Sequence, residues 1–235
     1  MADNNNVSGT PSQQDTWLAR GAAILGVIAV FGNLLGVLVL GDIPEAYKPG
    51  QLESWLNDSL AHPGDAIDSA IYFTLGVLLM VPFAVALMKL VRGPLAGLAV
   101  LGAAFIVAGA LINGSATMAP FVIIEQLQGA VAPEDPAFRA TAFALLGWTV
   151  TMDAVFNALL GAGMILAGIA MWCDSGFGRI AGGWGVVAGV ATLPVMFQPI
   201  SYGAAEWLAV AAPLWALWIL WVSIRLWLLP KRTAA

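Results

Sequence analysis

Charged residues are scarce in this chain. Asp, Glu, Lys and Arg make up only 10% of the 235 residues, whereas 60% are hydrophobic, and the mean hydropathy is +0.86. Soluble domains carry about 25% charged residues. The composition therefore predicts that a lipid bilayer surrounds most of the chain, as a single membrane domain with no soluble module attached to it.

Cysteine and histidine are almost absent, which excludes several kinds of chemistry. The one cysteine, Cys173, cannot form an intrachain disulfide or a four-cysteine metal site. The one histidine, His62, cannot supply the two axial ligands of a bis-histidine haem, and with Asp65 and Asp68 it is interpreted as part of a loop and helix cap, not as a metal site. No GxxxxGKS/T phosphate loop is present. We predict no catalytic residue, no cofactor, no metal and no nucleic-acid partner.

Long apolar runs are what the sequence does contain. Six of them cover approximately residues 17–41, 66–91, 94–118, 143–172, 178–200 and 204–229. Each is long enough to cross a hydrocarbon core about 30 Å thick. The predicted fold class is therefore all-α, a polytopic integral membrane protein with a bundle of six transmembrane helices in residues 17–229. The polar residues 1–16 are expected to form a disordered cytoplasmic tail, and residues 230–235 a second tail.

Lys and Arg are distributed unevenly between the two ends of these spans. With the N terminus inside, seven basic residues lie at inner ends and two lie outside. The inner ones are Arg20, Lys89, Arg92, Arg179, Arg225, Lys231 and Arg232, and the outer ones are Lys48 and Arg139. Because basic residues favour the cytoplasmic side, both termini are predicted to be cytoplasmic.

The first outer connection contains a short amphipathic segment. Leu52, Trp55, Leu56, Ser59 and Leu60 recur at helical spacing, and polar residues occupy the opposite face. Such a helix either lies as a lid on the membrane surface or over the mouth of the bundle, or closes the bundle as a structural cap. We favour the cap.

Strongly polar side chains within the spans are the main candidates for a functional site, because they are costly inside a membrane. Counted at about 1.5 Å per residue from the inner ends, they fall in one layer near the outer end. One hypothesis is an outward-facing pocket for a cation or a small polar molecule. The alternative is that the asparagines only bond helices together while Asp153 reaches interfacial water. The candidate pocket consists of Asp68, Asn113, Asp153 and Asn157, and Asn33 and Gln198 are further polar residues of the spans.

The last span is rich in tryptophan. Trp215, Trp218 and Trp221 lie deeper than the interfacial positions that tryptophan usually occupies. They form either a docking face for a partner helix, an apolar ligand or a pigment, or bulky packing beside Pro213. Small residues in other spans, such as the Gly32 and Gly36 pair, are interpreted as internal packing faces.

Three segments carry a resemblance to a known family. They are RGAAILGVIAVFGNLLG in the first span, YFTLGVLLMVPFAVALMKLVR in the second and SGFGRIAGGWGVVAGV at the start of the fifth. In the order of these features, residues 17–200 resemble an uncharacterised prokaryotic family of six-span membrane proteins, the domain of unknown function four-three-eight-six. The resemblance implies the six-span architecture and a location in the plasma or inner membrane of a prokaryote. It implies no substrate or site residue.

Three functions remain open from the sequence. The first, which we favour because the inner halves of the spans are apolar and small, is a non-enzymatic protein that acts by association, as an accessory or regulatory subunit of a membrane complex or as a homo-oligomer. The second is a small transporter or a solute-binding or cation-binding protein that uses the outer polar layer. The third is an enzyme acting on lipid at the outer interface.

Overall fold

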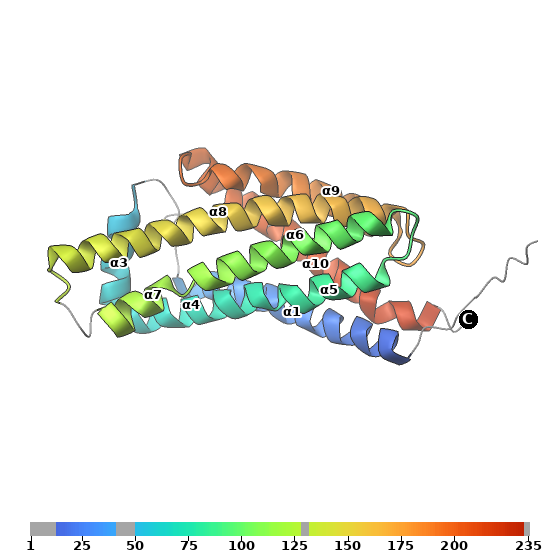
Figure 1. Cartoon of the computed structure of the whole chain (residues 1–235), viewed down its shortest axis with the longest axis horizontal. Coiled ribbons are helices and arrows are strands. Elements are labelled where there is room, and N and C mark those ends of the chain that lie inside the picture. The colour runs from blue at the N-terminus through green and yellow to red at the C-terminus, as the bar shows by residue number, and fades with distance from the viewer. Residues whose placement is uncertain (1–12, 41–49, 128–131, 233–235) are drawn as a thin grey trace, which may run out of the picture.

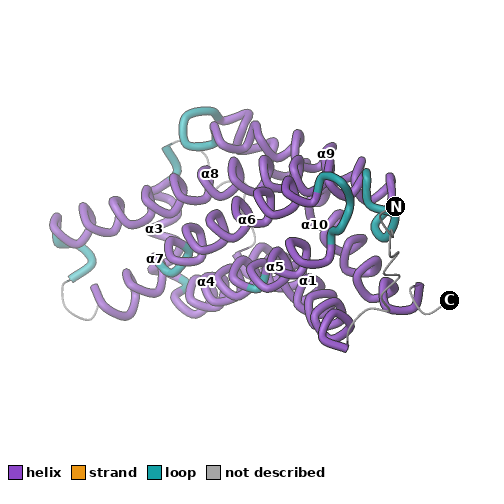
Figure 2. The backbone as a smooth tube through the Cα atoms, turned by 45° about the vertical axis from the view of Figure 1, so that its right-hand side comes forward, coloured by secondary structure: helices purple, strands orange, loops and turns teal. Residues whose placement is uncertain are grey.

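The computed structural model describes residues 13–40, 50–127 and 132–232. All regular structure in these ranges is helical, and the long helices run beside one another in an elongated bundle (Figures 1 and 2). In chain order the elements are α1 (Gln13–Leu40), α3 (Leu52–Ala61), α4 (Pro63–Leu78), α5 (Met80–Leu90), α6 (Ala96–Ala116), α7 (Ala119–Phe121), the π-helix η1 (Val122–Leu127), α8 (Pro136–Trp172), α9 (Gly178–Thr192), the 3-10 helix η2 (Leu193–Phe197) and α10 (Tyr202–Arg232).

Six helical units of the described chain are long and apolar enough to cross a membrane. They are Gln13–Gly36, Pro63–Leu90, Ala96–Glu125, Pro136–Trp172, Gly178–Phe197 and Tyr202–Leu229. The predicted all-α bundle of six spans is thereby confirmed.

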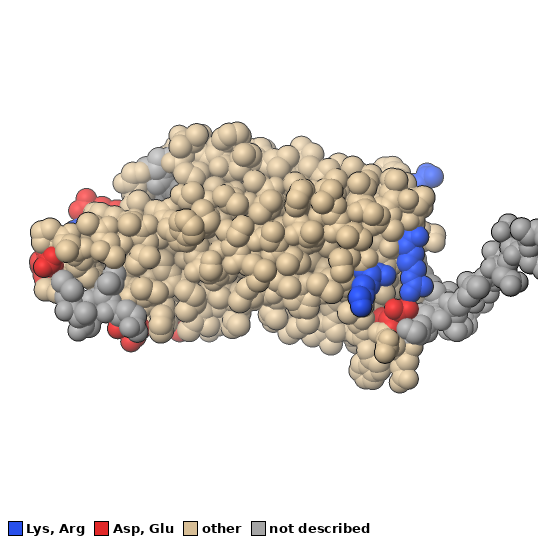
Figure 3. Space-filling model, viewed as in Figure 1, with Lys and Arg blue, Asp and Glu red and all other residues tan. Residues whose placement is uncertain are grey.

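Charge divides the bundle into two ends. The start of α1 meets the end of α10, where the Arg20 guanidinium carbon lies 5.6 Å from the ring centroid of Trp227. In Figure 3 the visible Lys and Arg side chains gather mostly at this end, which we call the basic end. Most of the visible Asp and Glu lie at the opposite end, the acidic end, and the broad band between carries no visible charge. An uncharged band is the surface that a bilayer requires.

Most of the spans extend beyond their predicted bounds: α4 begins at Pro63, the third span reaches Glu125 and α10 ends at Arg232. Gln13–Thr16, assigned to the tail from the sequence, form the first turn of α1, where the Asp15 carboxylate pairs with Arg92 at 2.7 Å. Helix α8 begins at Pro136 because Asp135 accepts the N–H of Ala137 at 2.7 Å, as an N-cap residue does. Hydropathy misses such turns because they are helical but polar. Residues 1–12, 41–49 and 233–235, which include Lys48, most of the first predicted tail and half of the second, lie outside the described residues.

Glycine brings the spans into backbone contact. A Cβ atom on Gly102 of α6 would lie 2.6 Å from the carbonyl oxygen of Gly163 on α8, and one on Gly32 of α1 would lie 3.1 Å from the Cα atom of Gly76 on α4. Close approach of this kind stabilises helix pairs in lipid through van der Waals contact. Glycines at these positions are therefore used inside the bundle, as the sequence led us to expect.

Two apolar clusters fill the interior. The main cluster spans the membrane part of the bundle and includes Phe83, Leu160, Met164 and Trp218. A second one, the acidic-end cluster, consists of Trp55, Leu56, Ile123, Phe138, Ala142, Leu146 and Val150 from α3, η1 and α8. Along α8, Val150 belongs to the acidic-end cluster and Phe156 to the main one. The intervening turn of α8 is where polar residues lie.

Candidate functional site

A carboxylate surrounded by carboxamides occupies that turn. Asp153 accepts an N–H from Asn113 at 3.0 Å, from Asn157 at 2.9 Å and from Gln198 at 2.7 Å. Asn113 lies on α6, Asp153 and Asn157 on α8, and Gln198 directly follows η2. We call these four residues the Asp153 cluster. It joins three chain segments around one ionisable group.

The local sequence explains how each partner arrives. Asp153 and Asn157 are four residues apart on one helical face, and the Asn157 amide also donates to the Asp153 carbonyl oxygen at 2.8 Å. Gln198 lies at the end of η2, and Pro194 of η2 comes two residues after the end of α9. Proline cannot continue the α-helical hydrogen bonds, so the chain tightens into the 3-10 helix and turns toward α8.

Burial in the cluster is uneven. The side chains of Asn113 and Asn157 are each 2% exposed and that of Gln198 is 0% exposed, whereas Asp153 is partly exposed. Two buried atoms, Asn113 Oδ1 and Gln198 Oε1, have no hydrogen-bond partner. Buried polar atoms are nearly always bonded. The cluster therefore holds two carbonyl oxygens beside the carboxylate with free capacity to accept a bond.

A small pocket lies one helical turn from the cluster, toward the acidic end. Thr117 follows Asn113 by four residues on α6, and Thr149 precedes Asp153 by four on α8; both line the pocket. Its hydroxyl groups are bonded to the bundle, since Thr117 Oγ1 lies 2.7 Å from Thr74 Oγ1 and Thr149 donates to the Ala116 carbonyl at 2.8 Å. The lining residues are Trp55, Ala66, Ser69, Ala70, Phe73, Thr117, Pro120 and Thr149.

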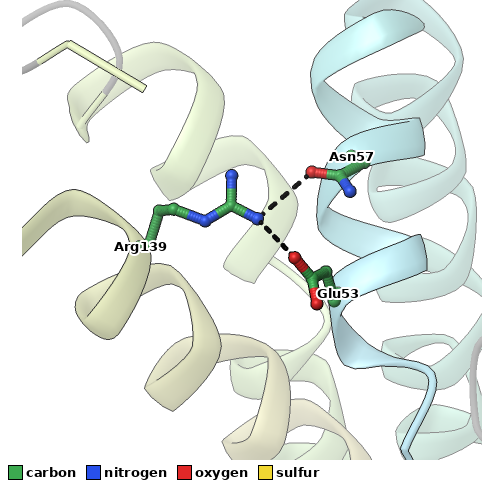
Figure 4. A network of polar contacts seen from close by, with 3 residues as sticks. All are labelled: Glu53, Asn57 and Arg139. Atoms are coloured by element: carbon green, nitrogen blue, oxygen red, sulfur yellow. Dashed lines mark hydrogen bonds and ion pairs between the residues drawn. The ribbon is translucent and has the colours of Figure 1, made fainter. Parts of the chain in front are cut away.

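Helix α3 closes this pocket at the acidic end. Trp55 and Leu56 are buried, at 6% and 0% exposure, and Trp55 lines the pocket. On the other face of α3, Arg139 of α8 donates to Glu53 at 3.1 Å and to Asn57 at 3.4 Å (Figure 4). The amphipathic segment thus forms a helix that covers the end of the bundle and is tied to α8 by a polar contact.

The structure brings together three of the four residues of the candidate pocket. Asn113, Asp153 and Asn157 bond to one another, and Gln198 joins them. Asp68 is exposed on α4, and within the described residues the amide hydrogen bonds to the Asp153 carboxylate come from the three carboxamides and not from α4. Asn33 lies elsewhere and donates to the Ala29 carbonyl of its own helix at 2.9 Å.

The three tryptophans of α10 do not share one exposed face. Trp218 is 0% exposed, donates to the Ala181 carbonyl at 3.1 Å and meets Phe83 edge-on, with the ring centroids 6.3 Å apart. Trp215 is 8% exposed and Trp221 is 41% exposed. Trp218 fits inside because a glycine, Gly185, faces its indole ring. Internal packing therefore accounts for two of the three side chains.

A second bonded carboxylate, Asp174, lies at the basic end, and its role was not predicted from the sequence. Asp174, 8% exposed, accepts backbone N–H groups from Arg92 at 2.6 Å, Gly93 at 3.2 Å, Gly176 at 2.6 Å and Phe177 at 3.4 Å. It ties the turn between α5 and α6 to the turn between α8 and α9. The run Asp-Ser-Gly after α8 is typical of a turn, but the partners at Arg92 and Gly93 are more than eighty residues away.

Among the described residues, no group of three or more His, Cys, Asp and Glu side chains is arranged to hold a metal ion. His62 lies instead between α3 and α4, with its Nδ1 atom 3.2 Å from Asp58 Oδ1. Both side chains are more than half exposed.

Comparisons with known proteins add no relative. No family model, no curated protein and no solved structure matches this chain. The resemblance to the six-span family of unknown function stays a prediction. The fold and the Asp153 cluster are the observations from which a function is argued.

Proposed function

We propose that this chain is a multi-pass protein of a prokaryotic plasma membrane that binds a small cation or a small polar solute at the Asp153 cluster. The observation that carries the proposal is the carboxylate of Asp153 inside a spanning helix, with three carboxamides directed at it. An ionisable side chain within a span is costly and usually marks a binding site or an ion path.

Helix packing alone does not require such a group. Interhelical hydrogen bonds between neutral side chains, such as the pair of Thr74 and Thr117 at 2.7 Å, already join α4 to α6. A charge adds a desolvation cost that neutral pairs avoid. The side-chain oxygens of Asn113 and Gln198 accept no hydrogen bond, so they do not contribute to helix packing.

The acidic end attracts cations. Exposed carboxylates of Glu53, Asp58 and Asp65 lie on or beside α3, and a surface of one sign raises the local concentration of the opposite ion. The pocket lined by Thr117 and Thr149 lies between this surface and the cluster.

The proposed orientation places the acidic end outside the cell and both termini in the cytoplasm. Five basic residues whose side chains are described belong to the basic end, namely Arg20, Lys89, Arg92, Arg179 and Arg225, against Arg139 at the acidic end. This distribution agrees with the preference of Lys and Arg for cytoplasmic loops.

Cys173, the exposed thiol at the basic end, gives a direct test of orientation. In intact cells a membrane-impermeant maleimide is expected to leave Cys173 unlabelled and to label a Glu53→Cys variant made in a Cys173→Ser background. Permeabilised cells serve as the control in which both thiols react. Labelling of Cys173 in intact cells would reverse the orientation.

Binding is tested by thermal unfolding of the purified protein in detergent against a panel of alkali and alkaline-earth chlorides, ammonium, small amines and sugars. At least one compound is expected to stabilise the wild-type protein and to have no effect on Asp153→Asn. Asp58→Asn, the same substitution at an exposed carboxylate, is the matched control and should respond like wild type. If no compound separates wild type from Asp153→Asn, the proposal fails.

Action by association, as an accessory subunit or a homo-oligomer, is the second candidate. It is favoured by what lies on the basic side of the cluster: α8 continues with Phe156, Leu160 and Met164, all packed in the main apolar cluster. A transporter would need polar residues to continue along this side, so this apolar packing favours association over transport. Co-purification in mild detergent tests it: a stoichiometric partner or a defined oligomer is expected, and a solitary monomer would oppose it.

A further inference from the structure

We infer that the Asp153 cluster is an alkali-cation site in which Asn113 and Gln198 turn their side-chain oxygens toward the ion. The inference rests on the proposed function and narrows its ligand to one chemical class. That class is a singly charged ion bound by oxygen atoms alone. Charge, the unpartnered oxygens and the interrupted helices around the cluster each support it.

Charge selects a monovalent ion. The cluster contains one carboxylate, Asp153, and its three bonded partners, Asn113, Asn157 and Gln198, are neutral. One positive charge makes the site neutral. A divalent ion would leave an uncompensated charge among buried side chains, which is strongly unfavourable.

The oxygen atoms needed by such an ion are already at the site. Each carboxamide carries a donor nitrogen and an acceptor oxygen. In the structure the nitrogens of Asn113 and Gln198 point at Asp153, while their oxygens are buried without partners. A half-turn of each carboxamide exchanges the two atoms. Oxygen then replaces nitrogen beside the carboxylate, an arrangement that is repulsive when empty and favourable around a cation.

The same two side chains therefore serve two states of one site. In the empty state they stabilise the carboxylate by donating N–H groups. In the occupied state they contribute oxygen ligands, which alkali and other hard cations prefer. Asn157 acts as a positioning residue, because its amide is bonded to both the carboxylate and the backbone carbonyl of Asp153.

Interrupted helices border the cluster on two sides. Helix α6 ends at Ala116, and a turn at Thr117 and Met118 precedes α7. Helix α9 gives way to η2 just before Gln198. Cation sites in membrane transporters are commonly built where helices are broken, because backbone carbonyls there become available. Gln198 Nε2 also donates to the carbonyl oxygen of Val150 in the continuous helix α8, at 3.4 Å.

The test is a sodium titration of the full-length protein in detergent, with choline chloride replacing NaCl at constant ionic strength and KCl and CaCl2 as comparisons. At about 100 times the dissociation constant, Na⁺ is expected to raise the unfolding temperature by roughly 5–10 °C. The rise should be absent in Asp153→Asn and retained in Asp58→Asn. Gln198→Asn, which keeps a carboxamide but shortens its reach, is expected to need at least about tenfold more Na⁺, as for the loss of one good ligand.

Infrared difference spectra of the wild-type protein, Na⁺ minus choline, keep the test independent of variant folding. Carboxylate and carboxamide bands are expected to shift together. If CaCl2 stabilises the protein through Asp153 more than the alkali chlorides do, or if only another panel solute acts through Asp153, this inference is overturned while the proposed function stands. If no compound distinguishes wild type from Asp153→Asn and the spectra do not change, both are overturned.

Discussion

Two carboxylates near opposite ends of the bundle are held in opposite ways. Asp174 at the basic end accepts four backbone N–H groups from two interhelical turns. Asp153, toward the acidic end, accepts three side-chain N–H groups. Backbone donors are fixed by the fold, whereas a carboxamide exchanges donor for acceptor when it rotates. The backbone donors around Asp174 hold one fixed structure. The carboxamides around Asp153 are able to exchange a donor for an acceptor.

Unused hydrogen-bonding capacity separates the two sites further. Both Asp174 oxygens are bonded to the turns they join. The Asp153 cluster retains two free carbonyl oxygens, on Asn113 and Gln198. The partners of Asp153, unlike those of Asp174, therefore have acceptor atoms available for a ligand.

The largest effect on stability is expected from Asp174→Asn. The new amide would direct N–H groups at backbone N–H groups that cannot turn away, so hydrogen bonds to a charged acceptor are lost and donors are left unsatisfied. The cost should be about 3 kcal/mol, measured as a fall in the free energy of unfolding in mixed detergent micelles. A cost below about 1 kcal/mol would show that Asp174 does not hold the turns together.

The same substitution at Asp153 should cost much less. In Asp153→Asn the carboxamide of Gln198 is able to rotate and accept from the new amide through its free oxygen. We expect a loss of less than about 1 kcal/mol, measured by the same unfolding assay, with loss of any response to ligand. Equal costs at the two aspartates would remove the distinction between them.

The smallest effects are expected from the exposed ion pairs at the two ends. Arg92→Ala breaks the pair with Asp15, and Arg139→Ala breaks the pair with Glu53. Each should change stability by about 0.5 kcal/mol, and a stability assay repeated at high salt should reduce the difference further. A much larger loss of stability from Arg139→Ala would mean that the position of helix α3 over the end of the bundle depends on this contact.

The six spans were predictable because hydropathy reports on lipid contact, which dominates this fold. What hydropathy could not give is helix that continues into water, such as the start of α8 at Pro136. Likewise, the sequence showed that Trp218 lies deep in its span, but not that its side chain is buried. That burial depends on Gly185 of the neighbouring helix α9. That contact joins residues distant in sequence.

The depth of the candidate site in the bundle was predictable from the sequence, but the side of each helix on which its residues lie was not. Counting residues along each helix placed Asp68 at the level of Asn113 and Asp153, yet depth does not fix rotation about the helix axis. Asp68 is exposed, whereas Gln198, at the same depth, enters the cluster through the 3-10 helix after α9. Asp174 was missed because two of its four donors come from a remote turn.

Carbodiimide labelling of the wild-type protein tests the central claim most directly. The reagent modifies protonated carboxyl groups, and peptide mass spectrometry reports Asp153 and Asp174 in one sample. If the Asp153 cluster binds an alkali cation, replacing choline chloride with NaCl should protect Asp153 and leave the labelling of Asp174 unchanged. Labelling of Asp153 that does not depend on Na⁺, or protection of both aspartates alike, would contradict the account.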